Sequence, residues 1–488
     1  MHLEDLFEKR EKSQLELITA LMHVPEEIPL KEIIILTDLA RSTLLKYIED
    51  LNQLAKAQNF ELEIHLFHDS LTLKMGRHIT KEDIIQLLIP FSVKIKILNY
   101  LYEKDEFTVQ KLSQSLTISE ATLHRQLTGL NVSLAEFGIS IKNGRLRGEE
   151  HQIRYFYYHL YWLTIPKKEM AQGFHLQQFQ GILETINQFW TMEMSTTNEF
   201  KLALWFSITK QRIRVKHKTF KELKRLMRPY LNHRFFKQVR QQMLRYLSRY
   251  ALEVEEEETM CQFIFITSMS ILSSHVMERK LGYGGPVSDA TTRGLQFVRA
   301  IVQTGENLNE QGLYTLNQVL GQLYFFKGAL IDRNYSLDSD LALVGSYMSL
   351  EHADYAQEMI QEIATDIYNV KLTQFGDLLS KSHWRIMEVF SFVIDQPPQQ
   401  LRIGLALSGS QTKRMPVLTA LRHQLEINRW VTIDWWDDHE TFDFVISNVY
   451  NECYEVPYYY LKGAPNAFDI QQLTTIINEH LTRDKSTV

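Results

Sequence analysis

The chain has 488 residues, two cysteines and a formal net charge of −6 at pH 7. This length exceeds what one hydrophobic core serves and predicts three or more domains. So few cysteines exclude a disulfide scaffold, and the negative charge argues against a protein that coats nucleic acid without specificity. Cys261 and Cys453 show no metal-ligand spacing, and we expect no metal, no cofactor and no catalytic site.

Targeting and membrane signals are not visible in the sequence. No apolar run approaches the ~20 residues that cross a bilayer. The N-terminal stretch MHLEDLFEKREK is charged and lacks the apolar segment of a signal peptide. We therefore expect a cytoplasmic protein that makes no contact with a membrane.

The N-terminal third of the chain carries one pattern twice. Shifting PLKEIIILTDLARSTLLKYIEDLN by 79 positions aligns Leu44 with Leu123 and Asn52 with Asn131, and every core position stays apolar. In the first copy, the residues expected to face outward on or near the second helix are Arg41, Ser42, Thr43 and Lys46. Downstream, FELEIHL and LTLKM predict a hairpin that we expect to be shorter than that of the second copy.

The second copy shows the pattern most clearly, after packing helices predicted within residues 81–106. Apolar residues at helical spacing predict a short helix, a turn, and a second helix that Ser119 caps, with its apolar stripe at Leu123, Leu127 and Leu130. This arrangement is a helix-turn-helix. The side chains opposite the stripe are short or hydrogen-bonding and suit base edges and phosphates in a major groove: Ala121, Thr122, His124, Arg125 and Thr128.

A basic hairpin follows this helix. Asn143-Gly144 is typical of a tight turn between two strands, and the cations Lys142, Arg145 and Arg147 surround it, with no acid between Phe137 and Gly148. We interpret it as a wing that holds phosphates. Two-helix corners also occur in proteins that bind no nucleic acid. Because the first 150 residues hold 18 Lys+Arg against 23 Asp+Glu, any DNA contact must come from local patches.

From Glu149 the pattern becomes helical, first as an exit helix that joins the reader to the rest and then as two helical segments divided near Pro286. Between Phe200 and Tyr250 there are fifteen Lys+Arg against the single acid Glu222, and an acidic block with Glu253 and Glu255–Glu258 follows. Two interpretations are open. The basic run is either a solvated face paired with its acidic neighbour or a site for a phosphate-bearing anion.

The last part of the chain changes class. After a linker near Pro397, the segments RIGLALSG, VTIDWW and FDFVISN alternate with helical patterns, which indicates a small parallel-sheet α/β domain. Its first loop enters a helix, so Ser408, Gly409, Ser410 and Thr412 could cradle a phosphate.

This order of modules resembles the Mga and AtxA family of bacterial virulence regulators, and the segment ISIKNGRLRGEEHQIRYFYYHLYW looks like that family's wing and exit helix. The resemblance implies a mainly α, multidomain protein with tandem winged helix-turn-helix units, two helical bundles like the PTS-regulation domains (PRD) of the sugar phosphotransferase system (PTS), and a C-terminal small α/β domain similar to an enzyme IIB. The expected domains are 1–78, 79–165, 166–284, 285–396 and 400–488.

The resemblance also implies histidine phosphorylation by PTS phosphocarrier proteins. The helices LALWFSITKQRIR and LYTLNQVLGQLYFF have no histidine at the family's usual first position, which leaves His217, inside the basic run, and His383, expected in a loop, as candidates. The enzyme IIB-like domain has no cysteine in the loop after its first strand, so it cannot transfer phosphate through a thiolate. We expect it to form a homodimer surface.

The sequence therefore favours a transcriptional regulator that binds promoter double-stranded DNA and is not an enzyme. The resemblance implies an activator of virulence or metabolic genes. A PTS phosphocarrier or phosphotransferase is one alternative, and an RNA-binding antiterminator is another. The antiterminators begin with a small β-rich RNA module, which the repeated helix-turn-helix pattern does not fit.

Overall fold

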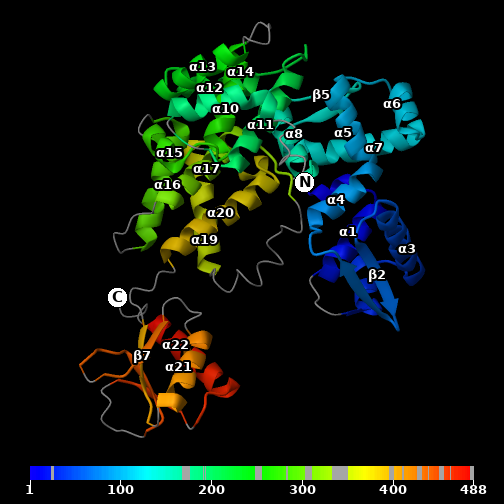
Figure 1. Ribbon diagram of the computed structural model, residues 1–488. Helices are drawn as coiled ribbons and strands as arrows, with labels where there is room; N and C mark the ends of the chain where they lie inside the picture. Colours follow the sequence, from blue (N-terminus) through cyan, green and yellow to red (C-terminus); the bar gives the residue numbers. More distant parts are fainter. Residues whose placement is uncertain are drawn as a thin grey trace. The chain divides into compact units, whose positions relative to one another are not determined.

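The protein is mostly helical, with three small sheets in the described residues (Figure 1). A computed structural model describes the chain outside residues 23–26, 167–175, 191, 193, 248–254, 282–283, 303–309, 332–349, 395–400, 409–410, 426–430, 438, 450–455, 462 and 484–488. It separates into two compact units, Met1–Ile394 and Asp395–Val488. The mainly α class is confirmed, whereas the domain boundaries expected inside the first unit stay predictions.

The first unit, residues 1–75, where the first helix-turn-helix is expected, has a three-stranded sheet, ordered β1-β3-β2. Its elements are η1 (Leu3–Leu6), α1 (Lys9–Met22), β1 (Ile28–Pro29), α2 (Leu30–Thr37), α3 (Arg41–Ala57), β2 (Leu62–Phe67) and β3 (Ser70–Met75). The expectation of a shorter hairpin here is wrong, because β2 and β3 pair over six residues each. Alternating burial along β2 explains the length, since Leu62 and Ile64 anchor that strand on the core.

The second unit repeats the first around the turn between its two helices. Its elements are α4 (Lys81–Leu88), η2 (Ile89–Phe91), α5 (Val93–Lys104), α6 (Val109–Leu116), α7 (Glu120–Leu134), η3 (Ala135–Phe137), β4 (Ser140–Lys142) and β5 (Arg145–Arg147). Both α2 and α6 have eight residues, and each ends at a left-handed residue, Asp38 at φ 49° and Thr117 at φ 55°. Matching backbone reversal at matched positions supports the repeat read from the sequence.

Helix α8 (Glu150–Thr164) is the expected exit helix, and residues 150–160 are all buried. Side chains of α8 form hydrogen bonds to α5 on one side and to the helical region on the other, all within the first compact unit. The Tyr157 hydroxyl donates to the Leu98 carbonyl of α5 at 2.9 Å, and Gln152 donates to the Phe325 carbonyl of the helical region at 3.3 Å. The second unit therefore shares one hydrophobic core with the helices that follow.

The helices that follow α8 complete the first compact unit, Met1–Ile394. They are α10 (Leu176–Trp190), α11 (Thr196–Arg212), α12 (Lys221–Met227), η4 (Arg228–Tyr230), α13 (Arg234–Leu247), α14 (Glu256–Ser268), α15 (Ser274–Leu281), α16 (Pro286–Val302), α17 (Glu310–Phe325), α19 (Leu350–Glu362), the π-helical turn η7 (Ile363–Ile367), η8 (Leu372–Gln374) and α20 (Asp377–Ile394). Helix α8 packs on α11, α14 packs on α17, and α17 packs on α20.

The first residues also contact this region. The Met1 amino group lies 2.6 Å from Glu136 at the end of the second unit and forms a second ion pair with Asp377, the first residue of α20. The Leu3 amide donates to the Ile331 carbonyl at 2.8 Å. This segment thus connects the second unit to α20 independently of α8.

The second compact unit, Asp395–Val488, is a four-stranded parallel sheet with the strand order β7-β6-β8-β9. Its elements are β6 (Leu401–Ala406), α21 (Gln411–Leu425), β7 (Val431–Trp435), β8 (Phe444–Ser447), β9 (Tyr458–Tyr460) and α22 (Ala467–Arg483). It has its own apolar core, formed in part by Ile403, Ile433 and Leu473. The parallel arrangement agrees with the strand–helix alternation of the sequence.

Among the described residues no single helix is both long and apolar enough to cross a membrane. One bent helix pair, Asp83–Phe91 with Val93–Lys104, meets the length and composition criteria together. Its apolar residues Ile84, Leu88 and Leu98 are buried in the core.

Candidate nucleic-acid interface

Helix α7 is held by its cap and by one buried face. The Ser119 hydroxyl accepts a hydrogen bond from the Thr122 amide at 3.1 Å, as expected for an N-cap. The buried positions of the helix are Leu123, Gln126, Leu130 and Leu134. Leu127 of the predicted stripe is half-buried and packs against the same core, and Gln126 beside it is buried as well.

The outward face of α7 contains the residues predicted for DNA contact. Ala121, His124, Arg125 and Thr128 are exposed, and Thr122 is half-buried. The Thr128 hydroxyl donates to the His124 carbonyl at 2.9 Å, and Thr122 accepts from Ser119 at 2.9 Å. Arg125 has no hydrogen-bond or ion-pair partner among the described residues, so its guanidinium is available to a ligand.

The wing of the second unit has the predicted turn. Asn143 at φ 50° and Gly144 at φ 70° give the two positive φ angles of a type I′ turn. Lys142 and Arg147 are exposed. Arg145 is half-buried, and its Nε donates to the Glu106 carboxylate at 2.6 Å. The sequence pattern did not reveal this acid, because Glu106 precedes the first helix of the motif and comes close to Arg145 only when the hairpin folds.

One asparagine in each unit holds the wing to the outward-facing helix. The Asn131 side chain accepts from the Ile141 amide at 2.6 Å and donates to the Ile141 carbonyl at 3.1 Å. Asn52 makes the same two bonds to Ile64, at 2.9 Å and 2.9 Å. The alignment of Asn52 with Asn131 was visible in the sequence, but its role required the tertiary structure. Each asparagine satisfies both backbone groups of one strand residue and fixes the wing relative to the helix.

The first unit presents less free positive charge than the second. Arg41, Ser42 and Lys46 are exposed and Thr43 is half-buried. However, Arg41 forms an ion pair with Asp69 at 2.7 Å. On its hairpin, the exposed Lys74, which the sequence analysis overlooked, lies directly opposite Glu63. Nearby acids therefore offset the cations of this unit.

The two histidines predicted as phosphorylation candidates have different environments. His217 is exposed after the end of α11. His383 is not in a loop, as expected, but inside α20, where its Nε2 donates to the Ala353 carbonyl at 2.8 Å. The helix begins earlier than predicted, at Asp377, because Leu378 and Leu379 belong to its apolar side.

The basic run pairs with the acidic block that follows it. Lys218 lies 2.8 Å from Glu258, Arg240 lies 2.9 Å from Glu256, and Lys224 forms an ion pair with Glu257. Glu253 lies outside the described residues. Of the two interpretations left open by the sequence, these contacts favour a basic face paired with its acidic neighbour.

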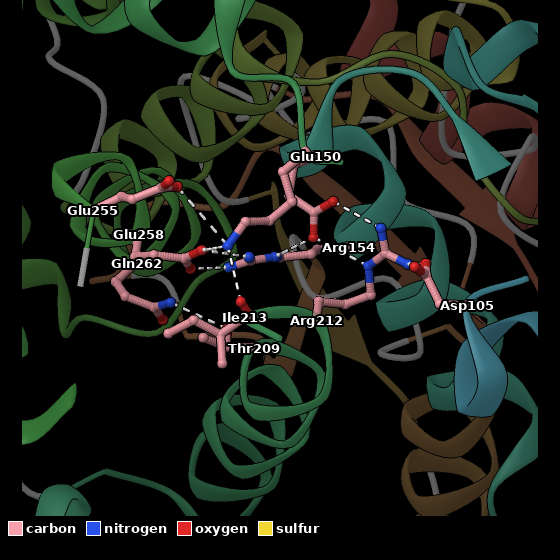
Figure 2. Close-up of polar contacts among 10 residues, drawn as sticks. Asp105, Glu150, Arg154, Thr209, Arg212, Ile213, Glu255, Glu258 and Gln262 are labelled. Atoms are coloured by element: carbon pink, nitrogen blue, oxygen red, sulfur yellow. Dashed lines mark hydrogen bonds and ion pairs between the residues drawn. The ribbon is translucent and has the colours of Figure 1, made fainter. Parts of the chain in front are cut away.

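Part of this pairing is a buried network between α8, α11 and α14 (Figure 2). Arg154 makes bonds of 2.6 Å and 3.0 Å to Glu258 and one of 2.9 Å to Glu150, and Arg212 makes bonds of 3.1 Å and 2.8 Å to Glu150. Burial acts to raise the pKa of Glu150, but Arg212 and then Arg154 outweigh it and hold that pKa below its usual value. The same holds for Glu258, where Arg154 and Lys218 outweigh burial. The network joins the exit helix to the helical region.

In the second compact unit, a side chain from elsewhere in the same unit bonds to the loop that was predicted to cradle a phosphate. The Ser408 amide donates to Asn448 at 2.7 Å, so this N–H is not free for an anion. Gly409, Ser410 and the Thr412 side chain lie outside the described residues.

Comparison with known proteins identifies the second unit. A family model described as the Mga helix-turn-helix domain matches residues 77–161. The matched segment runs from α4 to α8 and includes α6, α7 and the wing. No curated protein matches the chain.

Proposed function

We propose that this protein, whose residues 77–161 match the Mga helix-turn-helix domain, is a DNA-binding transcriptional regulator of the Mga family that acts on promoter DNA. The observation that supports this proposal is the coincidence of the match with an exposed polar face. The matched unit holds Arg125, Lys142 and Arg147, which are exposed and have no ion-pair partner in the described part of the chain.

In this proposal α7 enters the major groove through its N-terminal half. Arg125 supplies the forked donor that suits guanine or phosphate, and the hydroxyls of Thr122 and Thr128 retain acceptor capacity after their local bonds. Lys142 and Arg147 would hold the phosphates on either side, and these contacts position the helix without reading sequence. The Arg145–Glu106 ion pair would stiffen the wing.

The first unit has a secondary role in this mechanism. Its Arg41 is tied to Asp69 and its Lys74 faces Glu63, so phosphate contacts there compete with acids of the protein itself. Lys46 is exposed on α3 and has no such competitor among the described residues. We therefore assign most of the affinity to the second unit and expect the first to extend the site.

The regulation implied by the family belongs to the proposal as well. Phosphorylation by PTS phosphocarrier proteins would take place at His217, which is exposed, or at His383, whose Nε2 already donates a hydrogen bond. The C-terminal α/β unit, with its separate core, would supply a homodimer surface. Both points can be tested by phosphoamino-acid mapping and by the solution mass of the chain with and without residues 400–488.

The decisive experiment measures DNA binding by the full chain. Genomic footprinting identifies a bound fragment, and fluorescence anisotropy on it compares the wild type with Arg125→Ala, Lys46→Ala and the control Arg228→Ala, an exposed arginine on the helical region. We expect Arg125→Ala to weaken binding about tenfold or more, since a good base contact contributes roughly 1–3 kcal/mol. The control should bind like the wild type.

The wing is tested by salt dependence. Lys142→Ala should weaken binding to all sequences alike and reduce the salt slope by about 1, as loss of one phosphate contact does. If Arg125→Ala and Lys46→Ala both bind with wild-type affinity while remaining folded, the proposal is wrong.

A further inference from the structure

The acidic block pairs with only part of the basic run. The α11–α12 segment, residues 212–221 with the sequence RIRVKHKTFK, joins the last residue of α11 to the first residue of α12 and holds five Lys+Arg and no acid. Three of these cations are exposed and have no ion pair or hydrogen bond to any residue that the structure describes: Arg214, Lys216 and Lys221. Their charge is therefore available to a partner.

The other two cations of the α11–α12 segment turn inward and fix its path. Arg212 is 2% exposed and donates to the Glu150 carboxylate at 2.8 Å and 3.1 Å. Lys218 donates to the Glu258 carboxylate at 2.8 Å and to the Ile213 carbonyl at 3.0 Å. Both anchors end in the buried network of Figure 2, so the exposed cations of the segment extend from a backbone that is held in place.

The start of the α11–α12 segment lies beside the wing of the second unit. Arg212 Nη1 is 3.6 Å from the carboxylate of Asp105, the residue that ends α5, and α11 also packs against α5. The next residue, Glu106, accepts a hydrogen bond from Arg145 Nε at 2.6 Å. Arg145 is the first residue of β5, so this end of the segment is held next to the turn of the wing.

The other end of the α11–α12 segment lies beside the residues that leave the wing. The Thr219 carbonyl accepts from the Glu150 amide at 2.8 Å. The carboxylate of Glu149, two residues after β5, accepts from the Glu222 amide at 3.0 Å and so caps the first turn of α12, which begins at Lys221. The segment is thus tied to the second unit at both ends of β5.

The exposed cations of the α11–α12 segment add to the positive charge of the wing, where Lys142 and Arg147 are also exposed. They are spread over residues 214–221 rather than gathered at one point. Cations in a row suit a row of phosphates, because each Lys or Arg releases counterions at its own phosphate. A duplex offers one negative charge per about 1.7 Å of its axis, whereas one phosphorylated side chain offers at most about two charges at one point.

We propose that the α11–α12 segment is a further DNA contact, in which Arg214, Lys216 and Lys221 bind phosphates of the duplex next to those held by the wing. This inference rests on the proposed function. Phosphate contacts add affinity without reading sequence, so the segment contributes equally on any duplex. The contact places the helical region on the DNA together with the helix-turn-helix unit.

The test measures DNA binding by the full chain over a range of salt concentrations. Fluorescence anisotropy uses a duplex that extends about ten base pairs, one helical turn, beyond the footprint on each side, and a second duplex of equal length with the footprinted sequence scrambled. The site variant is Arg214→Gln/Lys216→Gln/Lys221→Gln, and the matched control is Arg228→Gln, at an exposed arginine directly after α12. The triple variant should lower the salt slope by about 3 and weaken binding to both duplexes by the same factor.

The control should keep the wild-type slope, and Lys216→Arg/Lys221→Arg should keep it as well because the charges remain. Circular dichroism checks that each variant is folded. A triple variant with the wild-type slope would overturn the proposal, and so would an equal loss per charge in Arg228→Gln, which would reflect net charge alone. Arg125→Ala is measured alongside: if it loses binding while the triple variant does not, only this inference is wrong. If the wild type binds neither duplex, the proposed function fails and this inference fails with it.

Discussion

Replacing Arg154 by methionine tests the buried network directly. The guanidinium is fully buried and makes three charge-assisted hydrogen bonds, two to Glu258 and one to Glu150. Methionine keeps much of the aliphatic stem but leaves the carboxylates less compensated. Breaking a buried ion pair from one side costs about 3–5 kcal/mol. We expect the lower end, about 3 kcal/mol, since Arg212 still binds Glu150 and Lys218 still binds Glu258.

The stability lost in Arg154→Met should also depend on pH. In the wild type, Arg154 and Lys218 outweigh burial and hold the pKa of Glu258 below its usual 4.5, so this carboxylate stabilises the fold above that pH and loses its contribution as the pH falls. Without Arg154, burial raises the pKa of Glu258, and the carboxyl takes up a proton in the native state on mild acidification. The stability difference between wild type and variant is therefore largest at neutral pH and narrows toward acid.

Chemical denaturation followed by circular dichroism, at neutral pH and at about pH 5, measures both effects on the full chain. The double variant Arg154→Met/Glu258→Gln provides the control, because removing both partners should cost less than the sum of the two single changes. A loss below about 1 kcal/mol for Arg154→Met would contradict the reasoning. So would a loss independent of pH, or additive single and double variants.

Three further outcomes follow from the second unit and the core. Asn131→Ala should destabilise by about 1–3 kcal/mol and weaken DNA binding, as thermal unfolding and anisotropy would show, because both backbone groups of one wing residue lose their partner. Gly144→Ala should cost more than Gly138→Ala in thermal unfolding, since both have positive φ but only at Gly144 would a Cβ lie 2.0 Å from the Phe107 carbonyl oxygen. Cys261, buried with its pKa raised by burial, should resist iodoacetamide in the native protein and react once the chain is unfolded, as peptide mass mapping would detect.

The local architecture of the N-terminal third could be predicted from the sequence alone. Helical periodicity, the Ser119 cap and the Asn143-Gly144 turn are short-range signals, and each is encoded within one or two turns of backbone. The repeat at 79 positions strengthened them, because a matched apolar pattern in a second copy is hard to produce by chance. The outward exposure of Arg125 followed from the same periodicity.

Charge pairing, by contrast, was decided by the tertiary structure. The ion pair of Arg145 with Glu106 and that of Arg154 with Glu258 join residues far apart in the chain, and no periodic pattern records which acid a cation will meet. Counting basic residues therefore indicated a possible anion site in the run after Phe200, whereas in the folded protein cations of that run form ion pairs with Glu256, Glu257 and Glu258. Burial and distance, rather than composition, determine whether a charge is compensated.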